Sequence, residues 1–309
     1  MRISILGVGS MGSVVATALA STGHEIHLHV RGERGANLML NGIECIGQSC
    51  TSVTADRFIF SCEEFEPPQA IKENSDIVII CTKAQSVHSL LEMSQFVLKP
   101  DGIAFCLANG LGHMEALRQR LGLHRVLAAT TTHGAFTDTD GCVHWVGEGN
   151  INLAIPPLGP NAQGLEEVVD CLQEGHLNPK IQTDALSMIW EKVLLNIAIN
   201  PIAALGGLKN GELLAPELFS MCMMVYREAA QVGRLERIEV PGEQEFEHRL
   251  RLVLESTKEN SCSMLEDVKH GRSTEIGFLN LAIVTLAEEH GLEVPLNQLL
   301  STLIEACHP

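Results

Sequence analysis

The chain has 309 residues, of which 45% are hydrophobic and 19% are charged, and its formal net charge at pH 7 is -17. The length suits two domains of a soluble globular protein. No uninterrupted apolar run predicts a membrane span, and the negative charge argues against nucleic acid or an anionic membrane as partner. The ten cysteines form no Cys-x-x-Cys pair and are scattered among apolar residues, which indicates reduced thiols in the cytoplasm.

The amino terminus carries the pattern of a dinucleotide-binding turn. A short apolar strand at residues 4–6 runs directly into Gly7-Val-Gly-Ser-Met-Gly12, and an apolar helix at residues 13–20 follows. In this Gly-x-Gly-x-x-Gly spacing Gly7 permits a tight turn, Gly9 lets a pyrophosphate approach the backbone, and Gly12 lets the helix pack closely on the strand. The phosphates would lie on the helix N-terminus, where unpaired N–H groups and the helix dipole favour anions.

The second predicted strand, at residues 25–30, indicates which dinucleotide binds. A site for NAD usually has an Asp or Glu at the end of this strand, where it hydrogen-bonds the ribose 2′-hydroxyl. This chain has Arg31 there and Arg34 shortly after it, and a guanidinium can hold a 2′-phosphate through two hydrogen bonds, so we predict NADPH. His27 and His29 share the less apolar face of the same alternating strand, and we predict no metal site.

Strands and helices alternate up to about residue 182, and almost only helical periodicity follows. We therefore expect an α/β protein with a Rossmann-type, mostly parallel sheet domain at 1–182, which binds NADP, and an all-helical substrate and catalytic domain at 183–309. A cleft between two such domains is a common place for ligands. Further strands are predicted at 76–81, 102–107, 126–131, 143–146 and 151–155, and helices at 184–204, 211–234, 241–255, 257–270 and 275–290.

The helix predicted at 184–204 is strongly apolar but carries a polar stripe. Lys192, Asn196 and Asn200 lie at i, i+4 and i+8, within roughly 80° of one face. Burying a lysine without a partner is costly, and the adjacent Glu191 points to another side of the helix. One ammonium and two carboxamides on a buried helix indicate the lining of a pocket. The alternative is a lysine that reaches solvent and asparagines that bond the backbone.

With these motifs the chain resembles the ketopantoate reductase (2-dehydropantoate 2-reductase) family over nearly its whole length. The glycine turn, Arg31 and the Lys192 helix are similar to that family's elements, and the remaining motifs follow in the right order. They are Cys81-Thr-Lys-Ala84, Ala108-Asn-Gly110, Thr130-Thr-Thr-His-Gly-Ala135, Lys209-Asn-Gly-Glu-Leu213, Asn260-Ser-Cys-Ser-Met-Leu265 and Thr274-Glu-Ile276.

The resemblance implies that NADPH delivers hydride to the keto carbon of a 2-oxo acid, with ketopantoate, from pantothenate and coenzyme A biosynthesis, as the favoured substrate. Lys192 would protonate the carbonyl oxygen, and Glu275, the second implied catalytic residue, would orient the lysine or the cofactor. The implied cofactor-binding residues are Gly7, Val8, Gly9, Ser10, Met11, Gly12, Arg31, Lys83, Asn109, Ala135 and Glu275. The implied substrate-binding residues are Lys192, Asn196, Asn200, Asn210, Asn260 and Ser263, whose neutral members bind an anion without adding a second charge beside the acid.

Several of these residues also have simpler interpretations. Glu275 follows a helix-start signal and could serve only the helix dipole, and Lys83 could be a solvated surface lysine. Asn109 and Asn210 each precede a glycine, as in ordinary turns, and Ser263 could be a surface hydroxyl.

Two positions depart from the family pattern and bear on the substrate. Gly277 stands where Asp is expected, and Leu281 stands where Gly is expected. A leucine in place of a glycine between packed helices could reshape the pocket wall.

Two other functions compete with an NADPH-dependent 2-oxo-acid reductase. A β-hydroxyacid dehydrogenase also pairs a glycine turn with Lys-x-x-x-Asn in a helical domain, but the Asn200-Pro201 pair and the spacing of twelve between Ser263 and Glu275 favour the reductase. The other is a non-catalytic NADPH sensor that signals redox state through a partner, and the presence of Lys192 together with Glu275 argues against it. Its expected partner is a small 2-oxo acid, with no nucleic acid and no membrane, and a homodimer is one option for its assembly.

Overall fold

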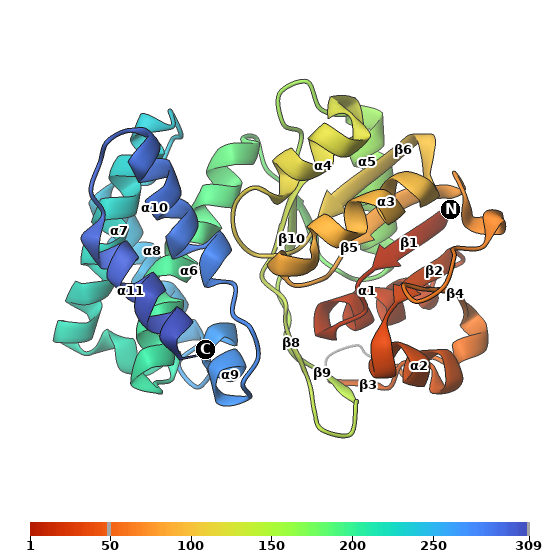
Figure 1. Ribbon diagram of the computed structural model, residues 1–309, viewed down its shortest axis with the longest axis horizontal. Coiled ribbons are helices and arrows are strands. Elements are labelled where there is room, and N and C mark those ends of the chain that lie inside the picture. The colour runs from red at the N-terminus through yellow and green to blue at the C-terminus, as the bar shows by residue number, and fades with distance from the viewer. Residues whose placement is uncertain (48–50, 308–309) are drawn as a thin grey trace. The chain divides into compact units, whose positions relative to one another are not determined.

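The computed structural model describes residues 1–47 and 51–307, and its contacts divide the chain into two compact units (Figure 1). The first unit comprises Met1–Ala108 and Gly112–Ala185, and the second comprises Asn109–Leu111 and Leu186–Pro309. Each unit has its own apolar core. The predicted fold class is confirmed, with a parallel sheet and its helices in the first unit and a helical second unit.

A five-stranded parallel sheet forms the centre of the first unit. The strands lie in the order β4-β2-β1-β5-β6, so the chain adds strands on one side of β1 and then returns to add strands on the other. In folds of this type ligands bind outside the carboxyl ends of the strands where the order reverses, here between β1 and β5. The strands are β1 (Arg2–Leu6), β2 (Glu25–Val30), β4 (Phe58–Cys62), β5 (Ser75–Ile80) and β6 (Leu98–Cys106).

Helices and two small sheets surround this sheet. Helix α1 packs against β1, β2 and α5, while α3 and α4 pack against each other and β6. The helices are α1 (Ser10–Ala20), α2 (Gly32–Asn41), α3 (Leu91–Val97), α4 (His113–Leu121) and α5 (Ala162–Glu174). The small sheets contain β3 (Cys45–Gly47), β7 (Ala128–Thr131), β8 (Gly134–Thr137), β9 (Val143–Gly147), β10 (Ile151–Ala154) and β11 (Pro179–Ile181).

The parallel-sheet prediction was wrong for the last three predicted strands. The segments at 126–131, 143–146 and 151–155 form β7, β9 and β10, and these lie in the small sheets, where β10 runs antiparallel to β7 and β9 runs antiparallel to β8. Only five residues lie between Thr137 and Val143, which allows a hairpin but no crossover helix. The strands β3, β4, β8 and β11 were not predicted.

The second unit consists of helices packed around α6 (Ala185–Gly206). The others are α7 (Pro216–Leu235), α8 (Glu243–Ser256), α9 (Ser263–Lys269), α10 (Asn280–Glu289) and α11 (Pro295–Ala306). The helix predicted at 257–270 begins only at Ser263, and the one predicted at 275–290 begins with a short 3-10 turn at Ile276–Phe278. The sequence prediction omitted α11, which starts with proline at its first helical position.

Helix α6 is long and apolar enough to cross a membrane by length and composition. However, 67% of its apolar window is buried inside the protein, mainly by side chains of the other helices of its unit. A helix that is hydrophobic on most of its surface is expected at the centre of such a core.

The cysteines depart in one place from the expected reduced thiols. Eight cysteines in the described part of the chain carry thiols, and most of these are buried. Cys45, at the start of β3, is disulfide-bonded.

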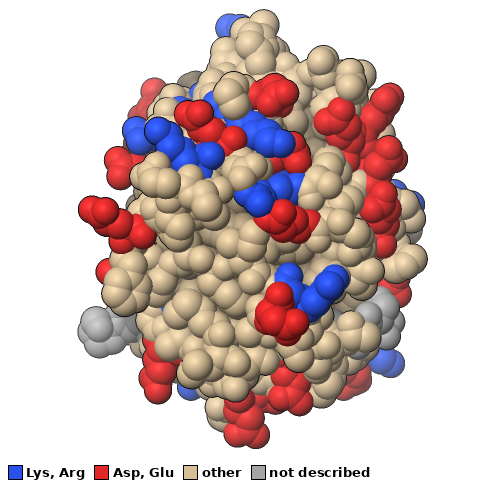
Figure 2. Space-filling view, turned by 90° about the vertical axis from the view of Figure 1, so that its right-hand side faces the viewer, with Lys and Arg blue, Asp and Glu red and all other residues tan. Residues whose placement is uncertain are grey.

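Acidic and basic side chains are mixed on the face shown in Figure 2. Lys and Arg side chains there lie beside Asp or Glu side chains, and no broad patch of one sign covers that face. Binding of an anionic ligand therefore depends on local groups and not on the net charge of -17.

A buried polar network crosses the parallel sheet of the first unit. Ser4 Oγ lies 2.6 Å from Ser75 Oγ and 2.7 Å from Nδ1 of His27. Nε2 of His27 lies 2.9 Å from Ser61 Oγ, which is also 2.8 Å from Nδ1 of His29. The predicted common face of the two histidines is therefore correct, but that face is buried. Burial lowers the pKa of His27 to about 3, so the ring is neutral in the native protein.

This network predicts a loss of stability in acid. Below pH 6.5 the unfolded chain protonates His27, whereas the native chain does not until about pH 3, so the stabilisation present at pH 7 is lost as the pH falls. At pH 5 the loss is roughly 2 kcal/mol. Urea unfolding at several pH values should show that His27→Asn reduces the slope of stability against pH between 7 and 5. The control His88→Asn removes an exposed ring and should leave the slope as it is. If His27→Asn leaves the slope of stability against pH unchanged, the loss of stability in acid does not come from His27.

Candidate functional site

The three glycines of the amino-terminal turn meet different structural demands. Gly7 has φ +88°, and a Cβ there would lie 2.7 Å from Cβ of Thr82. A Cβ on Gly12 would lie 2.2 Å from the carbonyl oxygen of Gly7, so that position needs glycine for helix packing. A Cβ on Gly9 would meet no protein atom within 4 Å, so protein packing does not explain the glycine there. Open space beside the backbone is what a closely approaching pyrophosphate requires.

The N-terminus of α1 is suited to hold an anion. Gly9 caps the helix without a side-chain acceptor, and the first turn contains no acidic residue. Ser10 and Met11 are half-buried, and Ser10 Oγ lies 2.8 Å from Oγ1 of Thr137 on β8. Ala135 lies two residues earlier on the same strand, so this contact links the predicted cofactor loop to the glycine turn. The side chain of Val8 belongs to the apolar core, which leaves its backbone as the part available to a ligand.

Two arginines follow β2, and they behave differently. Arg31 is exposed, donates from Nη2 to Ser86 Oγ at 3.0 Å and lies 3.7 Å from a carboxylate oxygen of Glu63. Arg34 turns back to the glycine turn, where Nε donates to the carbonyl of Val8 at 3.0 Å and Nη2 to Ser13 Oγ at 3.3 Å. Burial lowers the pKa of Arg34. Arg31 is therefore the arginine at the surface, and Arg34 supports the turn.

The remaining predicted cofactor residues follow neighbouring strands. Lys83 is exposed and comes three residues after β5, and Asn109 comes three residues after β6. Carboxyl ends of parallel strands meet at one edge of a sheet, so Lys83 follows the edge that also carries Gly7 and Arg31, whereas Asn109 is grouped with the second unit.

In the second unit α6 carries the predicted polar stripe within one continuous helix. Lys192 and Asn196 are half-buried, and Asn200 is 7% exposed. Glu191 pairs with Arg249 on α8 at 2.6 Å, so its side chain does point to another side of the helix.

Asn210 is held so that one of its polar atoms has no hydrogen-bond partner among the described residues. Its Nδ2 donates to Oγ1 of Thr257 at 2.9 Å, and that hydroxyl donates to the carbonyl of Val253 at 2.7 Å. Because the hydroxyl proton is already used, Thr257 must accept, and the amide orientation of Asn210 follows. Its Oδ1 is buried without a hydrogen-bond partner among the described residues. A buried acceptor of this kind is costly without a donor, and the groups around it would have to move before a ligand hydroxyl could reach it.

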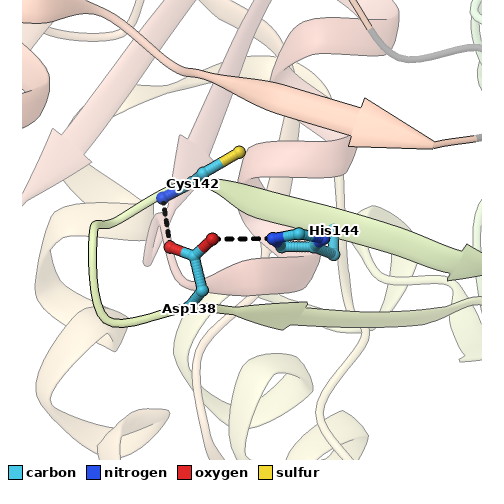
Figure 3. A group of neighbouring side chains, drawn as sticks. All are labelled: Asp138, Cys142 and His144. Carbon is cyan, nitrogen blue, oxygen red and sulfur yellow. Dashed lines mark hydrogen bonds and ion pairs between the residues drawn. The ribbon is translucent and has the colours of Figure 1, made fainter.

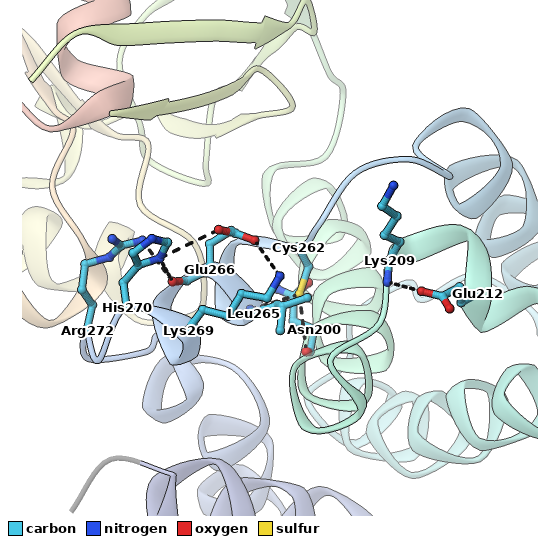
Figure 4. A network of polar contacts seen from close by, with 9 residues as sticks. All are labelled: Asn200, Lys209, Glu212, Cys262, Leu265, Glu266, Lys269, His270 and Arg272. Atoms are coloured by element: carbon cyan, nitrogen blue, oxygen red, sulfur yellow. Dashed lines mark hydrogen bonds and ion pairs between the residues drawn. The ribbon is translucent and has the colours of Figure 1, made fainter. Parts of the chain in front are cut away.

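The start of α9 lies beside Asn200, the last residue of the polar stripe (Figure 4). Cys262 donates from Sγ to the carbonyl of Asn200 at 3.6 Å, and the backbone N–H of Asn210 donates to the carbonyl of Asn260 at 3.0 Å. These contacts gather Asn200, Asn210, Asn260 and Ser263 in one region of the second unit. The side chains of Asn260 and Ser263 are exposed.

Glu275 contacts a residue that is distant in the sequence. Its Oε2 accepts a hydrogen bond from Nδ2 of Asn109 at 2.7 Å. Gly110 follows with φ +103°, and a Cβ there would lie 2.4 Å from the carbonyl oxygen of Phe278. Asn109-Gly110 is therefore more than an ordinary turn, because only glycine allows this close approach. Glu275 precedes the 3-10 turn and directs its carboxylate to Asn109.

The two departures from the family pattern have different surroundings. Gly277 is exposed, and a Cβ there would meet no protein atom within 4 Å. Leu281 is partly buried on α10 and packs against the helical core.

The hairpin between β8 and β9 contains another group of polar residues, Asp138, Cys142 and His144 (Figure 3). One carboxylate oxygen of Asp138 accepts the backbone N–H groups of Asp140 and Cys142, and the other lies 2.7 Å from Nε2 of His144. The sulfur of Cys142 points away from the carboxylate and the ring. We assign this group to closure of the hairpin, since the carboxylate already has three partners.

The sequence did not reveal the roles of three residues that shape the site, although Arg34 was noted beside Arg31. Thr257 orients Asn210, Arg34 supports the glycine turn, and Asn280 is buried on α10 beside α6. Their roles depend on contacts between distant segments, and only Arg34, near Arg31, had a local signal.

Comparison with known proteins supports one family for both units. Residues 3–157 match the family described as ketopantoate reductase PanE/ApbA, and residues 184–308 match its C-terminal domain family. The chain is 30% identical over 315 residues to 2-dehydropantoate 2-reductase of Pyrococcus horikoshii, covering 99% of this chain and 97% of the relative. It is 31% identical over 303 residues to the Vibrio cholerae protein of the same name, covering 97% of this chain and 95% of that relative.

Solved structures share the fold. A PanE/ApbA family ketopantoate reductase from Ralstonia eutropha JMP134 aligns with TM-score 0.86 and 24% identity, covering 99% of this chain and 98% of that one. D-mandelate dehydrogenase in complex with NADH aligns with TM-score 0.88 and 23% identity over the same shares.

Proposed function

Because the chain belongs to the ketopantoate reductase family, we propose that it uses NADPH to reduce a 2-oxo acid and that 2-dehydropantoate (ketopantoate) is its preferred substrate. The observation that carries this proposal is the set of Lys192, Asn196 and Asn200 on one buried helix, with Asn210 offering an acceptor nearby. This set provides one proton donor and several neutral groups for an anion. Turnover of ketopantoate with NADPH tests the proposal directly.

The first unit would hold the cofactor, which supplies a hydride to the carbonyl carbon. The residues present fit a dinucleotide, since Gly9 leaves space beside the backbone and the start of α1 has no acidic side chain. Arg31 would hold the 2′-phosphate. Its exposed contact with Glu63 at 3.7 Å is worth about 0–1 kcal/mol, so a phosphate dianion can replace the carboxylate. A protein of this fold binds NADH, and the preference for NADPH rests on Arg31.

The second unit would hold the substrate and supply the proton. Lys192 would donate its proton to the carbonyl oxygen as charge develops there. Asn196, Asn200, Asn260 and Ser263 would bind the carboxylate. Glu275, bonded to Asn109, would orient groups near the reacting carbonyl.

The acceptor on Asn210 favours a substrate with a hydroxyl. Its Oδ1 is an acceptor only, so it matches a hydroxyl donor and not a carboxylate. Ketopantoate has such a hydroxyl in addition to its ketone and carboxylate.

Location and assembly also belong to this proposal. Most cysteines in the described residues carry buried thiols, which suits the cytoplasm, although Cys45 is disulfide-bonded. A homodimer is compatible with the proposed activity.

Arg31→Ala should remove most of the preference for NADPH over NADH. A charge-assisted contact is worth about 1.5–3 kcal/mol, so NADPH affinity should fall about tenfold to a hundredfold while NADH affinity stays the same. Titration of both cofactors by fluorescence measures this. The matched variant Glu63→Gln removes the carboxylate beside Arg31 and should maintain or raise NADPH affinity. Equal affinity of the unmodified protein for both cofactors would show that Arg31 does not select NADPH.

Lys192→Ala should reduce turnover about 10²–10⁴-fold, the usual effect of losing a general acid. NADPH binding should change little, because the glycine turn and Arg31 hold the cofactor. Glu191→Gln is the matched control, since the neighbouring carboxylate pairs with Arg249 on another side of α6. Near-normal turnover of Lys192→Ala would require another proton donor.

Ketopantoate should be reduced far more efficiently than 2-oxoisovalerate, the branched 2-oxo acid without the hydroxyl. A site that hydrogen-bonds a hydroxyl can reject the analogue lacking it by up to about 10⁴–10⁵. Measuring kcat/KM for both acids at fixed NADPH gives the ratio of ketopantoate to 2-oxoisovalerate, and Asn210→Ala should lower this ratio. Equal values for the two acids in the unmodified protein would exclude ketopantoate as the selected substrate but leave the reductase chemistry in place.

A further inference from the structure

The helix with the polar stripe contains a proline that leaves one backbone carbonyl without its usual partner. Pro201 lies inside α6, where it has no N–H to donate to the carbonyl four residues earlier. That carbonyl belongs to Ile197, whose side chain is fully buried. An unpaired buried carbonyl destabilises a fold, so another donor is needed.

Asn280 provides this donor from another helix. Its Nδ2 lies 3.2 Å from the carbonyl oxygen of Ile197, and the residue is fully buried at the first position of α10. The bonded carbonyl lies between Asn196 and Asn200 in the sequence, within the segment of α6 that carries the stripe. This one contact therefore joins α10 to the part of α6 proposed to bind substrate.

Two further residues hold Asn280 in place. Its Nδ2 also donates to Oδ1 of Asn297 on α11 at 3.0 Å. Asn297 Nδ2 in turn donates to the carbonyl of Val225 at 3.3 Å and to Oε2 of Glu228 at 2.9 Å, both on α7. Glu228 also accepts the backbone N–H groups of Leu296 and Asn297 at 3.0 Å each, so the carboxylate caps the N-terminus of α11.

The chemistry of these partners sets both amide orientations. The carboxylate of Glu228 and the carbonyl of Val225 can only accept, so Asn297 must present its NH₂ group to them. Its oxygen then faces Asn280, which must present NH₂ as well. That same NH₂ group reaches Ile197, while Oδ1 of Asn280 has no partner in the described chain. Asn280 thus donates to the carbonyl of Ile197, which Pro201 cannot bond, although its own Oδ1 has no partner among the described residues.

We propose that Asn280 is a positioning residue for the reaction. Supported by Asn297 and Glu228, it donates a hydrogen bond to the Ile197 carbonyl, which Pro201 leaves without a helical donor. This bond fixes the geometry of Lys192, Asn196 and Asn200. The inference rests on the proposed function for the roles of those three residues. The hydrogen bonds themselves do not depend on that function.

A double-mutant cycle between positions 201 and 280 tests this proposal. Asn280→Ala should lower kcat/KM for the 2-oxo acid about tenfold to a hundredfold, as expected when a buried acceptor loses its donor, while the Kd of NADPH stays unchanged. Pro201→Ala restores a backbone N–H at position 201, so the helix can bond the Ile197 carbonyl itself. In the double variant, kcat/KM should therefore recover most of what Asn280→Ala alone loses.

Tyr226→Phe is the matched control for the loss of a buried hydrogen bond in the same unit. The hydroxyl of Tyr226 donates to the carbonyl of Pro241 and lies outside the set of Asn280, Asn297 and Glu228. This variant should lower the melting temperature but leave kcat/KM unchanged. If Asn280→Ala behaves in the same way, or if Pro201→Ala fails to restore kcat/KM, the proposal is overturned. If Asn280→Ala alone does not fold, recovery of a folded, active double variant supports the proposal, and failure to recover overturns it.

Failure of the proposed function would give a different result. An unmodified protein without turnover would contradict the reductase assignment. The melting temperatures of the four proteins in the cycle would still report whether positions 201 and 280 are coupled. Additive changes in melting temperature would contradict the hydrogen bond on which the inference depends.

Discussion

Polar groups inside the apolar helix α6 are the constraint on which the second unit depends. A side chain or carbonyl buried there has no water to bond, so each polar atom needs a partner from a neighbouring segment. The helix nevertheless contains Asn200, which is 7% exposed, and Pro201, which has no backbone N–H to donate to the Ile197 carbonyl. The neighbouring segments meet this demand through Asn280 from α10 and through the contact of Cys262 with the Asn200 carbonyl. The polar stripe therefore determines which residues the surrounding helices must present.

In the first unit the main constraint is the space around the backbone of the glycine turn, which determines how closely a ligand could approach it. Gly7 and Gly12 are required by neighbouring protein atoms, whereas Gly9 is not. Arg34 adds a brace to the same turn by bonding the Val8 carbonyl, which leaves Arg31 as the exposed guanidinium. A rigid turn loses little conformational entropy when a ligand binds, so in the proposed function this brace would support cofactor affinity without touching the cofactor.

Local patterns predicted the elements that carry their own signal. The strand before Gly7, the glycine spacing and the stripe on α6 each occupy a short run of sequence, and the structure places them in the expected elements. Segments whose structure depends on distant contacts were predicted less well. Residues 257–262 form no helix, since the Asn260 carbonyl accepts from Asn210 and the Thr257 hydroxyl accepts from the same residue. The pairing of β8 with β9 likewise depends on a hairpin closed by Asp138, which alternation of hydrophobic residues does not reveal.

The same distinction applies to the candidate site. Spacing in the sequence brings Lys192, Asn196 and Asn200 to one face, but it cannot show that Asn210 keeps an acceptor with no partner in the described part of the chain. That property follows from a chain of two hydrogen bonds, in which Val253 takes the hydroxyl proton of Thr257 and so forces the amide of Asn210 to donate. The Asn297 amide is oriented in the same manner by Glu228. In both cases an obligate acceptor at one end decides which atom is presented at the other. Under the proposed function, ligand preference would depend partly on residues that need not touch the ligand.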